Sequence, residues 1–508
     1  MSMPILLLGL CWIAPAIGDG PRTLDEAVGR PTVRVCDDPE FFRRISLDLI
    51  GRIPSVPEVR AFLDDPSPSK RSAKVESLIA SDEFDEHWGR LLAEWLTDRR
   101  AIFRVDADGE ALSESLASSI RRDRPYPEMA RDVVVGSGSS EENGSVNFLL
   151  RYDTDPIKLA GGVGKNLMGV TIQCAQCHHH PFARWQQDDF WGLAAVFARI
   201  RQFSSDEGDR TLAVLESPRG ELRRPDPSAK AGTEPMPTLL VRAQLPDGTK
   251  IPAAADRRRA LGDWLASAEN PYVARNLVNR AWAHFFGKAL IKNLDDPGKA
   301  TEAMPVLEFL AADFGRSGYS LKALARAIAL SRTYAQSTSE AEGSSPSWSR
   351  PVVRPIPLDP LYASIAQATG YEADRPGFED EDEIGDDEDG ESPAEPMPAP
   401  ELPFFQREDD PAAERLGERP ASLQRALVFM NGEHLREAVR SGARVCQAVL
   451  GPKIGHSHVE WAFLATLGRK PTEDESARMA RLMARDRREG LEDVFWVLLN
   501  SAEFQTNH

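Results

Sequence analysis

Apolar residues recur three or four positions apart along most of this chain, and this spacing constrains the fold more than its composition does. In residues 37–51 it predicts a helix that Asp37 or Asp38 can cap and that Gly51 can end. A second helix follows with Ser55 as its cap, and similar segments return up to the last residues. The sequence therefore predicts a mainly α, multi-helical two-domain protein with a small β-rich insert between the halves.

Changes in composition divide the chain into segments. Short apolar runs among frequent Pro and Gly predict the β-rich insert, and an acidic and then Pro-rich stretch predicts a solvated linker. The expected segments are a signal peptide at 1–19, a helical domain with a Cys-x-x-Cys-His motif at 32–202, the β-rich insert at 203–255, the first part of a helical C-terminal domain at 256–371, the linker at 372–403 and the second part of that domain at 404–508.

The first residues, MSMPILLLGLCWIAPAIGDG, have the pattern of a secretory signal. The apolar stretch Ile5–Ile13 is too short to span a bilayer, and Ala14-Pro15-Ala16 fits a cleavage site. The usual basic residues are missing, so a buried first helix or a misplaced start codon is the alternative. We expect export to the periplasm or cell envelope, and no other segment predicts a transmembrane helix.

Charge argues against two classes of partner. The net charge is −18, and ten acidic residues with no basic ones fall between Glu379 and Glu391. General affinity for nucleic acid or for anionic lipid needs a basic face. We therefore expect no nucleic-acid partner.

The stretch TIQCAQCHHHPFARW, residues 171–185, holds two of the five cysteines and three of the nine histidines. Cys174, Cys177 and His178 form a Cys-x-x-Cys-His motif. Covalent attachment of haem c needs this spacing, because two thiols add to the haem vinyl groups and the next histidine presents its imidazole to the iron. The motif predicts a haem c protein with a role in redox chemistry or electron transfer.

Three alternatives use the same stretch. A zinc or copper site would take its ligands from Cys174, Cys177, His178, His179 and His180, completed by a remote histidine such as His284 or His434. A thioredoxin-like dithiol needs the motif at the start of a helix, and Pro181 stops a helix soon afterwards. A local disulfide with polar histidines would leave a binding or scaffold protein without catalysis.

Two further questions concern the partners of the motif and of the remaining cysteines. His179 and His180 follow His178 too closely to reach the opposite face of a haem. The candidates for a distal ligand are Met168, His284, Met430 and His434. Cys11 would leave with the signal peptide, whereas Cys36 and Cys446 could pair with each other in an exported protein.

Five segments carry a family resemblance, and they occur in a fixed order. They are FFRRISLDLIGRIPSVPEVRAFLDDPSPSKR, CAQCHHHPFARWQQDDFWGLAAVFAR, NPYVARNLVNRAWAHFFGKAL, SGYSLKALARAIALSRTYAQS and LLNSAEFQTNH. Together they resemble an exported planctomycete family in which a cytochrome-like domain of unknown function precedes a planctomycete-specific domain of unknown function. The resemblance implies that residues 32–202 are the cytochrome-like domain.

The resemblance also implies partners. Many relatives carry an additional N-terminal cytochrome c domain, which we do not expect here, so a separate redox partner protein is implied. The association of the family with sulfatases and polysaccharide breakdown implies polysaccharide-processing enzymes as further partners. The family carries over no reaction, and the sequence offers no way to select an acid/base pair of carboxylates. The polar and aromatic residues of the second half are expected to pack its domain: Asn270, Tyr272, Asn279, Arg280, Trp282, His284 and Asp296.

Overall fold

Helices dominate the structure, as the spacing of apolar residues predicts, and strands form only small antiparallel sheets in the part of the chain described. The computed structural model describes residues 23–29, 34–97, 109–181, 183–204, 212–226, 238–292, 294, 302–338, 348–371, 433–484 and 486–508. The predicted signal peptide at 1–19 and linker at 372–403 lie outside the described residues. None of the described helices is long and apolar enough to cross a membrane.

The first helices are α1 (Leu24–Val28), α2 (Asp38–Ile50), α3 (Val56–Asp64), α4 (Lys70–Ile79), α5 (Asp82–Thr97) and α6 (Gly109–Arg121). Both predicted ends of α2 are confirmed. The Asp37 carboxylate accepts the amide of Glu40, and Gly51 ends the helix in the left-handed region at φ 70°. A Cβ atom at Gly51 would lie 2.4 Å from the ring of His87, so the close packing also requires glycine.

The middle of the chain combines short helices with small sheets. The helices are α7 (Tyr126–Val135), η2 (Gly144–Val146), α8 (Asn147–Arg151), α9 (Pro156–Gly162), η3 (Val163–Met168), η4 (Ile172–Gln176), α10 (Gln187–Ala194) and η5 (Ala195–Phe197). The strands are β1 (Gly138–Ser139), β2 (Ile200–Ser204), β3 (Leu212–Glu216), β4 (Arg223–Pro225) and β5 (Thr238–Leu240). They form one sheet in the order β1-β3-β2 and a separate β4-β5 pair. Strands β3, β4 and β5 fall within the predicted insert at 203–255, whereas β1, which pairs with β3, comes from far upstream.

The second half is helical apart from one short strand pair. Its helices are α11 (Arg257–Leu265), α12 (Val273–Phe286), α13 (Met304–Arg316), α14 (Leu321–Ala329), α15 (Leu358–Thr369), α17 (Glu433–Leu450), α18 (His456–Leu467), α19 (Glu473–Leu482), α20 (Arg487–Leu499) and α21 (Ala502–Gln505). Strand β6 (Arg354–Pro355) pairs antiparallel with β7 (Thr506–Asn507) at the C-terminus.

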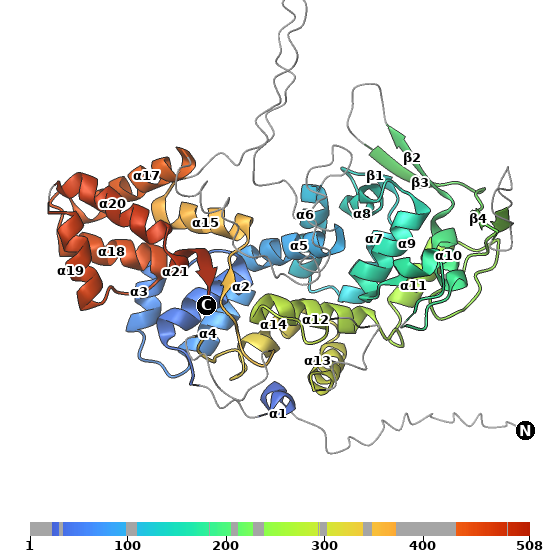
Figure 1. Cartoon of the computed structure of the whole chain (residues 1–508), viewed down its shortest axis with the longest axis horizontal. Coiled ribbons are helices and arrows are strands. Elements are labelled where there is room, and N and C mark those ends of the chain that lie inside the picture. Colours follow the sequence, from blue (N-terminus) through green and yellow to red (C-terminus); the bar gives the residue numbers. More distant parts are fainter. Residues whose placement is uncertain are drawn as a thin grey trace, which may run out of the picture.

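The order of the segments in space differs from their order in the chain. Helices α17 to α21 lie at one end of the molecule together with α2, α3 and α15, and α7 to α11 lie with the β1-β3-β2 sheet at the other end (Figure 1). Helices α5, α12 and α14 lie between these ends (Figure 1). Buried side chains from both halves of the sequence form one hydrophobic cluster. The first helices of the chain therefore share a core with its last helices.

Helix α2 joins these distant segments through charged side chains. We call Glu40, Arg43, Arg44 and Asp48 the α2 hub. The two arginines and Asp48 are each at most 1 % exposed, so their charges must be met by hydrogen bonds within the protein.

The partners of the α2 hub come largely from the C-terminal half. Arg43 donates to the carbonyl oxygens of Thr466, Glu503 and Phe504. Arg44 donates to the carbonyl oxygens of Tyr334, Gln336 and His508 and to the Glu40 carboxylate. Asp48 accepts from Tyr334, Arg354 and Asn507. The hub thus fastens the last residues of the chain to its first long helix.

Candidate functional site

The Cys-x-x-Cys-His residues lie on a short exposed turn. We call residues 171–187 the motif loop. Its first part is η4, a 3₁₀ helix, and Ile172 and Ala175 bury their side chains beneath it. Cys174 and Cys177 are exposed. Cys174 lies within this helix and Cys177 directly follows it, so both thiols stand on one short turn.

Neighbouring elements hold the motif loop at both of its ends. On the upstream side, Gly169 adopts φ 71°, and a Cβ there would lie 2.7 Å from the Asn276 side chain of α12. On the downstream side, the Gln187 amide donates to the Cys177 carbonyl oxygen at 2.6 Å. The indole of Trp191 in α10 donates to the Gln176 carbonyl oxygen at 3.0 Å. The exposed thiols therefore stand on a backbone that is fixed by α10 and α12.

The three consecutive histidines differ in what their rings present. The Nδ1 atom of His178 lies 2.8 Å from the His179 carbonyl oxygen, and because that oxygen only accepts, Nδ1 carries the proton. The Nδ1 atoms of His179 and His180 instead accept the amides of Gln187 and Ala183. The ring nitrogens nearest the backbone of these two histidines are therefore engaged within the loop.

The exposed thiols and the bonded imidazole are the groups of the motif loop that could hold a cofactor. Cys174 and Cys177 are both exposed, and the next residue, His178, has its Nδ1 atom bonded to a carbonyl oxygen. Metal-ligating histidines are usually oriented by such a bond. Within the described residues, no three side chains of His, Cys, Asp or Glu come together as a metal-binding group. In zinc or copper binding, the expected ligands Cys174, Cys177, His178, His179 and His180 would have to come together from the positions that they hold in this loop.

The candidates for a distal haem ligand lie in several different surroundings. Met168 is fully buried. His284 is buried in α12, where its Nε2 atom lies 2.8 Å from the Asp48 carbonyl oxygen and its ring contacts Trp88. His434 lies on α17 at the opposite end of the molecule from α10 (Figure 1). Met430 lies outside the described residues.

Cys36 and Cys446 are both buried free cysteines, so the pairing considered from the sequence is not formed. Cys36 precedes α2, where its amide donates to Ala335, and Cys446 lies within α17 with its thiol beside the His458 carbonyl oxygen. Burial raises the pKa of Cys36, and it raises the pKa of Cys446 to about 12. Neither thiol is activated as a nucleophile.

Four polar or aromatic residues of α12 serve packing, as expected. Asn279 bonds the backbone of Ile291, and Arg280 bonds the carbonyl oxygens of Trp95 and Lys165. Trp282 donates to the Trp348 carbonyl oxygen. These bonds and the burial of His284 join α12 to the segments around it.

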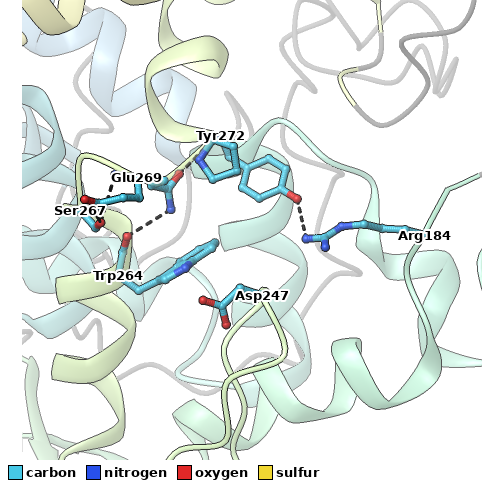
Figure 2. Close-up of a pocket in the computed structure, with 8 residues that line it drawn as sticks. Arg184, Asp247, Trp264, Ser267, Glu269 and Tyr272 are labelled. Atoms are coloured by element: carbon cyan, nitrogen blue, oxygen red, sulfur yellow. Dashed lines mark hydrogen bonds between the residues drawn. The ribbon is translucent and has the colours of Figure 1, made fainter. Parts of the chain in front are cut away.

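Two residues that we expected only to pack, Asn270 and Tyr272, line a pocket beside the motif loop (Figure 2). The cavity measures about 420 Å³. Arg184 of the motif loop reaches it and donates to the Tyr272 hydroxyl at 2.6 Å. Asp296, the remaining residue expected to pack, lies outside the described residues. The sequence signal for this pocket was the pair of aromatic residues, Trp264 and Tyr272, that flank the break between α11 and α12.

Two family models match the chain. Residues 25–202 match PSCyt2, described as a protein of unknown function (DUF1549), and residues 257–371 match PSD1, described as a protein of unknown function (DUF1553). No curated protein and no solved structure matches. The chain therefore belongs to a two-domain family of unknown function.

Proposed function

We propose that this chain is an exported haem c protein with a role in redox chemistry or electron transfer in the periplasm or cell envelope. One observation carries the proposal: Cys174 and Cys177 are both exposed on a turn that α10 holds, and the Nδ1 atom of His178, directly after them, is bonded to a backbone carbonyl oxygen. A bound haem would supply one-electron chemistry.

The chain's own residues have separate roles in this proposal. Cys174 and Cys177 hold the group covalently, and the His179 carbonyl oxygen orients the His178 ring. Gln187 and Trp191 keep the turn in place through their bonds to its carbonyl oxygens. A redox partner protein would approach the exposed thiol side. Polysaccharide-processing enzymes are the further partners that we propose, on the family resemblance.

The test is a haem-stained denaturing gel of the full chain, exported from a host that has cytochrome c maturation machinery. We expect stain that stays with the chain, and we expect Cys174→Ala and Cys177→Ala each to abolish or strongly weaken it. His179→Ala is the matched control and should stain like the unmodified chain, because the Nδ1 atom of His179 is already bonded to Gln187.

Two outcomes would contradict the proposal. A colourless chain that carries stoichiometric zinc or copper by elemental analysis would make the motif a metal site. A colourless, metal-free chain with a bond between Cys174 and Cys177 would favour a disulfide-stabilised binding or scaffold protein without catalysis.

A further inference from the structure

The pocket beside the motif loop has the build of a small-molecule site. Its lining comes from three segments that are separate in the sequence: Arg184, Asp247, and the connection from α11 to α12 (Figure 2). That connection contributes Trp264, Ser267, Glu269, Asn270, Pro271 and Tyr272. A volume of about 420 Å³ falls within the range of about 300–1,000 Å³ that is usual for such sites.

Two aromatic rings form the apolar part of the wall, and the fold fixes both. Trp264 and Tyr272 are half-buried, and their ring centroids lie 6.2 Å apart at an interplanar angle of 46°. Asn270 ties them together, because its amide group donates to the Trp264 carbonyl oxygen and its side-chain oxygen accepts the amide of Tyr272. The two rings are therefore already ordered before a ligand binds, which reduces the conformational entropy lost on binding.

Three charged side chains around these rings keep hydrogen-bonding capacity. Arg184 uses only Nη2, toward Pro246 and Tyr272, and its Nε and Nη1 atoms donate to no described residue. Asp247 accepts the Thr249 amide with Oδ1 alone. Glu269 accepts the Ser267 hydroxyl with Oε2 alone. Within the described part of the chain, no ion pair joins Arg184 to either carboxylate, so donors and acceptors are both open to a ligand.

The positive charge of Arg184 and the negative charges of Asp247 and Glu269 limit the net charge that a ligand of this pocket can carry. A cation would meet the guanidinium of Arg184, and an anion would meet the carboxylates of Asp247 and Glu269. A neutral ligand with hydroxyl groups avoids both conflicts, because each hydroxyl can accept from Arg184 and donate to a carboxylate. The aromatic walls add the requirement of a flat apolar face. A pyranose ring combines hydroxyl groups at its rim with such a face of C–H groups.

We propose that this pocket binds a neutral pyranose sugar, which stacks on Trp264 and hydrogen-bonds to Arg184 and Asp247. The proposal is independent of haem attachment, since none of the pocket residues belongs to the Cys-x-x-Cys-His motif. It assigns a binding role and no reaction.

Saturation-transfer NMR of the full chain tests the proposal with stated probes. The neutral probes are the methyl glycosides of glucose, galactose, mannose and fucose, and the charged probes are glucuronate and glucosamine. We expect saturation transfer to the ring protons of at least one neutral probe and weaker transfer to both charged ones. Asp247→Asn keeps the acceptor for Thr249 and should weaken binding ~10-fold, since it removes a charge-assisted hydrogen bond.

Two tryptophan variants complete the test. Trp264→Ala should abolish the transfer, whereas Trp496→Ala, a control on α20 with a partly exposed ring, should leave it unchanged. The circular dichroism of each variant shows that it is folded. Transfer to no neutral probe, preference for a charged probe, or an unchanged affinity in Asp247→Asn would each overturn the proposal.

Discussion

The α2 hub and the motif loop both gather side chains that could carry chemistry, and they use them in opposite ways. In the hub, the carboxylate of Asp48 and the guanidinium groups of Arg43 and Arg44 are buried and bonded to partners from the far end of the chain. In the motif loop, the thiols of Cys174 and Cys177 are exposed. The comparison shows that charged side chains can be bonded entirely within the fold, whereas the two thiols of the motif loop remain exposed to solvent.

The largest loss of stability is expected when the α2 hub loses the carboxylate of Asp48. Asp48→Ala leaves Arg354, Tyr334 and Asn507 without their shared acceptor, and breaking such a buried pair costs about 3–5 kcal/mol in the free energy of unfolding. Urea denaturation measures the loss. A loss below ~1 kcal/mol would mean that the hub does not fasten the C-terminus.

A smaller loss is expected when Arg43 is removed. Arg43→Ala leaves the carbonyl oxygens of Thr466, Glu503 and Phe504 without this donor, which should cost about 2–3 kcal/mol. Burial lowers the pKa of Arg43 to about 10, so the side chain stays charged at neutral pH. Arg259→Ala, at an exposed position of α11, is the matched control. Equal stability of the two variants would contradict the role of the hub.

The next prediction concerns how the free energy of unfolding depends on pH, and it involves the buried histidines His87 and His284. Burial lowers the pKa values of His87 and His284; the nearby charges of Arg90 and Arg354 act in the same direction, whereas Asp48 opposes it for His284. The unfolded chain therefore binds more protons below the unfolded pKa of about 6.5. Stability is full above that pH and falls as the pH drops below it, with a slope of up to ~1.4 kcal/mol per pH unit for each histidine.

Urea midpoints at pH 7.5 and pH 5.5 measure this slope. His87→Gln should reduce it, and the motif-loop control His179→Gln should not change it. An unchanged slope in His87→Gln would show that the buried pair of histidines is not its source.

The smallest effect on stability is expected in the motif loop. The double variant Cys174→Ser and Cys177→Ser should change the free energy of unfolding of the haem-free chain by no more than ~0.5 kcal/mol, because both side chains are exposed. Urea denaturation of this double variant and of Asp48→Ala under the same conditions compares the two losses of stability directly. A loss comparable to that of Asp48→Ala would show that the thiols are part of the structure and would erase the difference between the two regions.

Local patterns predict the helices but not the hub. The ends of α2 follow from Asp37 and Gly51, which act on their immediate neighbours. The burial of Arg43 and Arg44 does not, because helical spacing assigns such residues to a solvent face and their partners lie hundreds of residues away. Only the tertiary structure supplies those partners.

In the motif loop, too, some features can be predicted from the sequence and others require the tertiary structure. The spacing of Cys174, Cys177 and His178 is visible in the sequence. The hydrogen bonds of the neighbouring rings are not, because they depend on where the amides of Ala183 and Gln187 point. The distal ligand candidates were chosen by residue type, which does not show that His284 is already bonded to Asp48.

The central claim is that the motif loop, and not the hub, carries the chemistry of this chain. Its most direct test is the intact mass of the denatured full chain after export from a host that attaches haem c. The account predicts a mass above that of the polypeptide by one haem, which is lost in Cys174→Ala and retained in Arg43→Ala. A mass equal to that of the polypeptide alone, from a host that loads a control cytochrome, would contradict it.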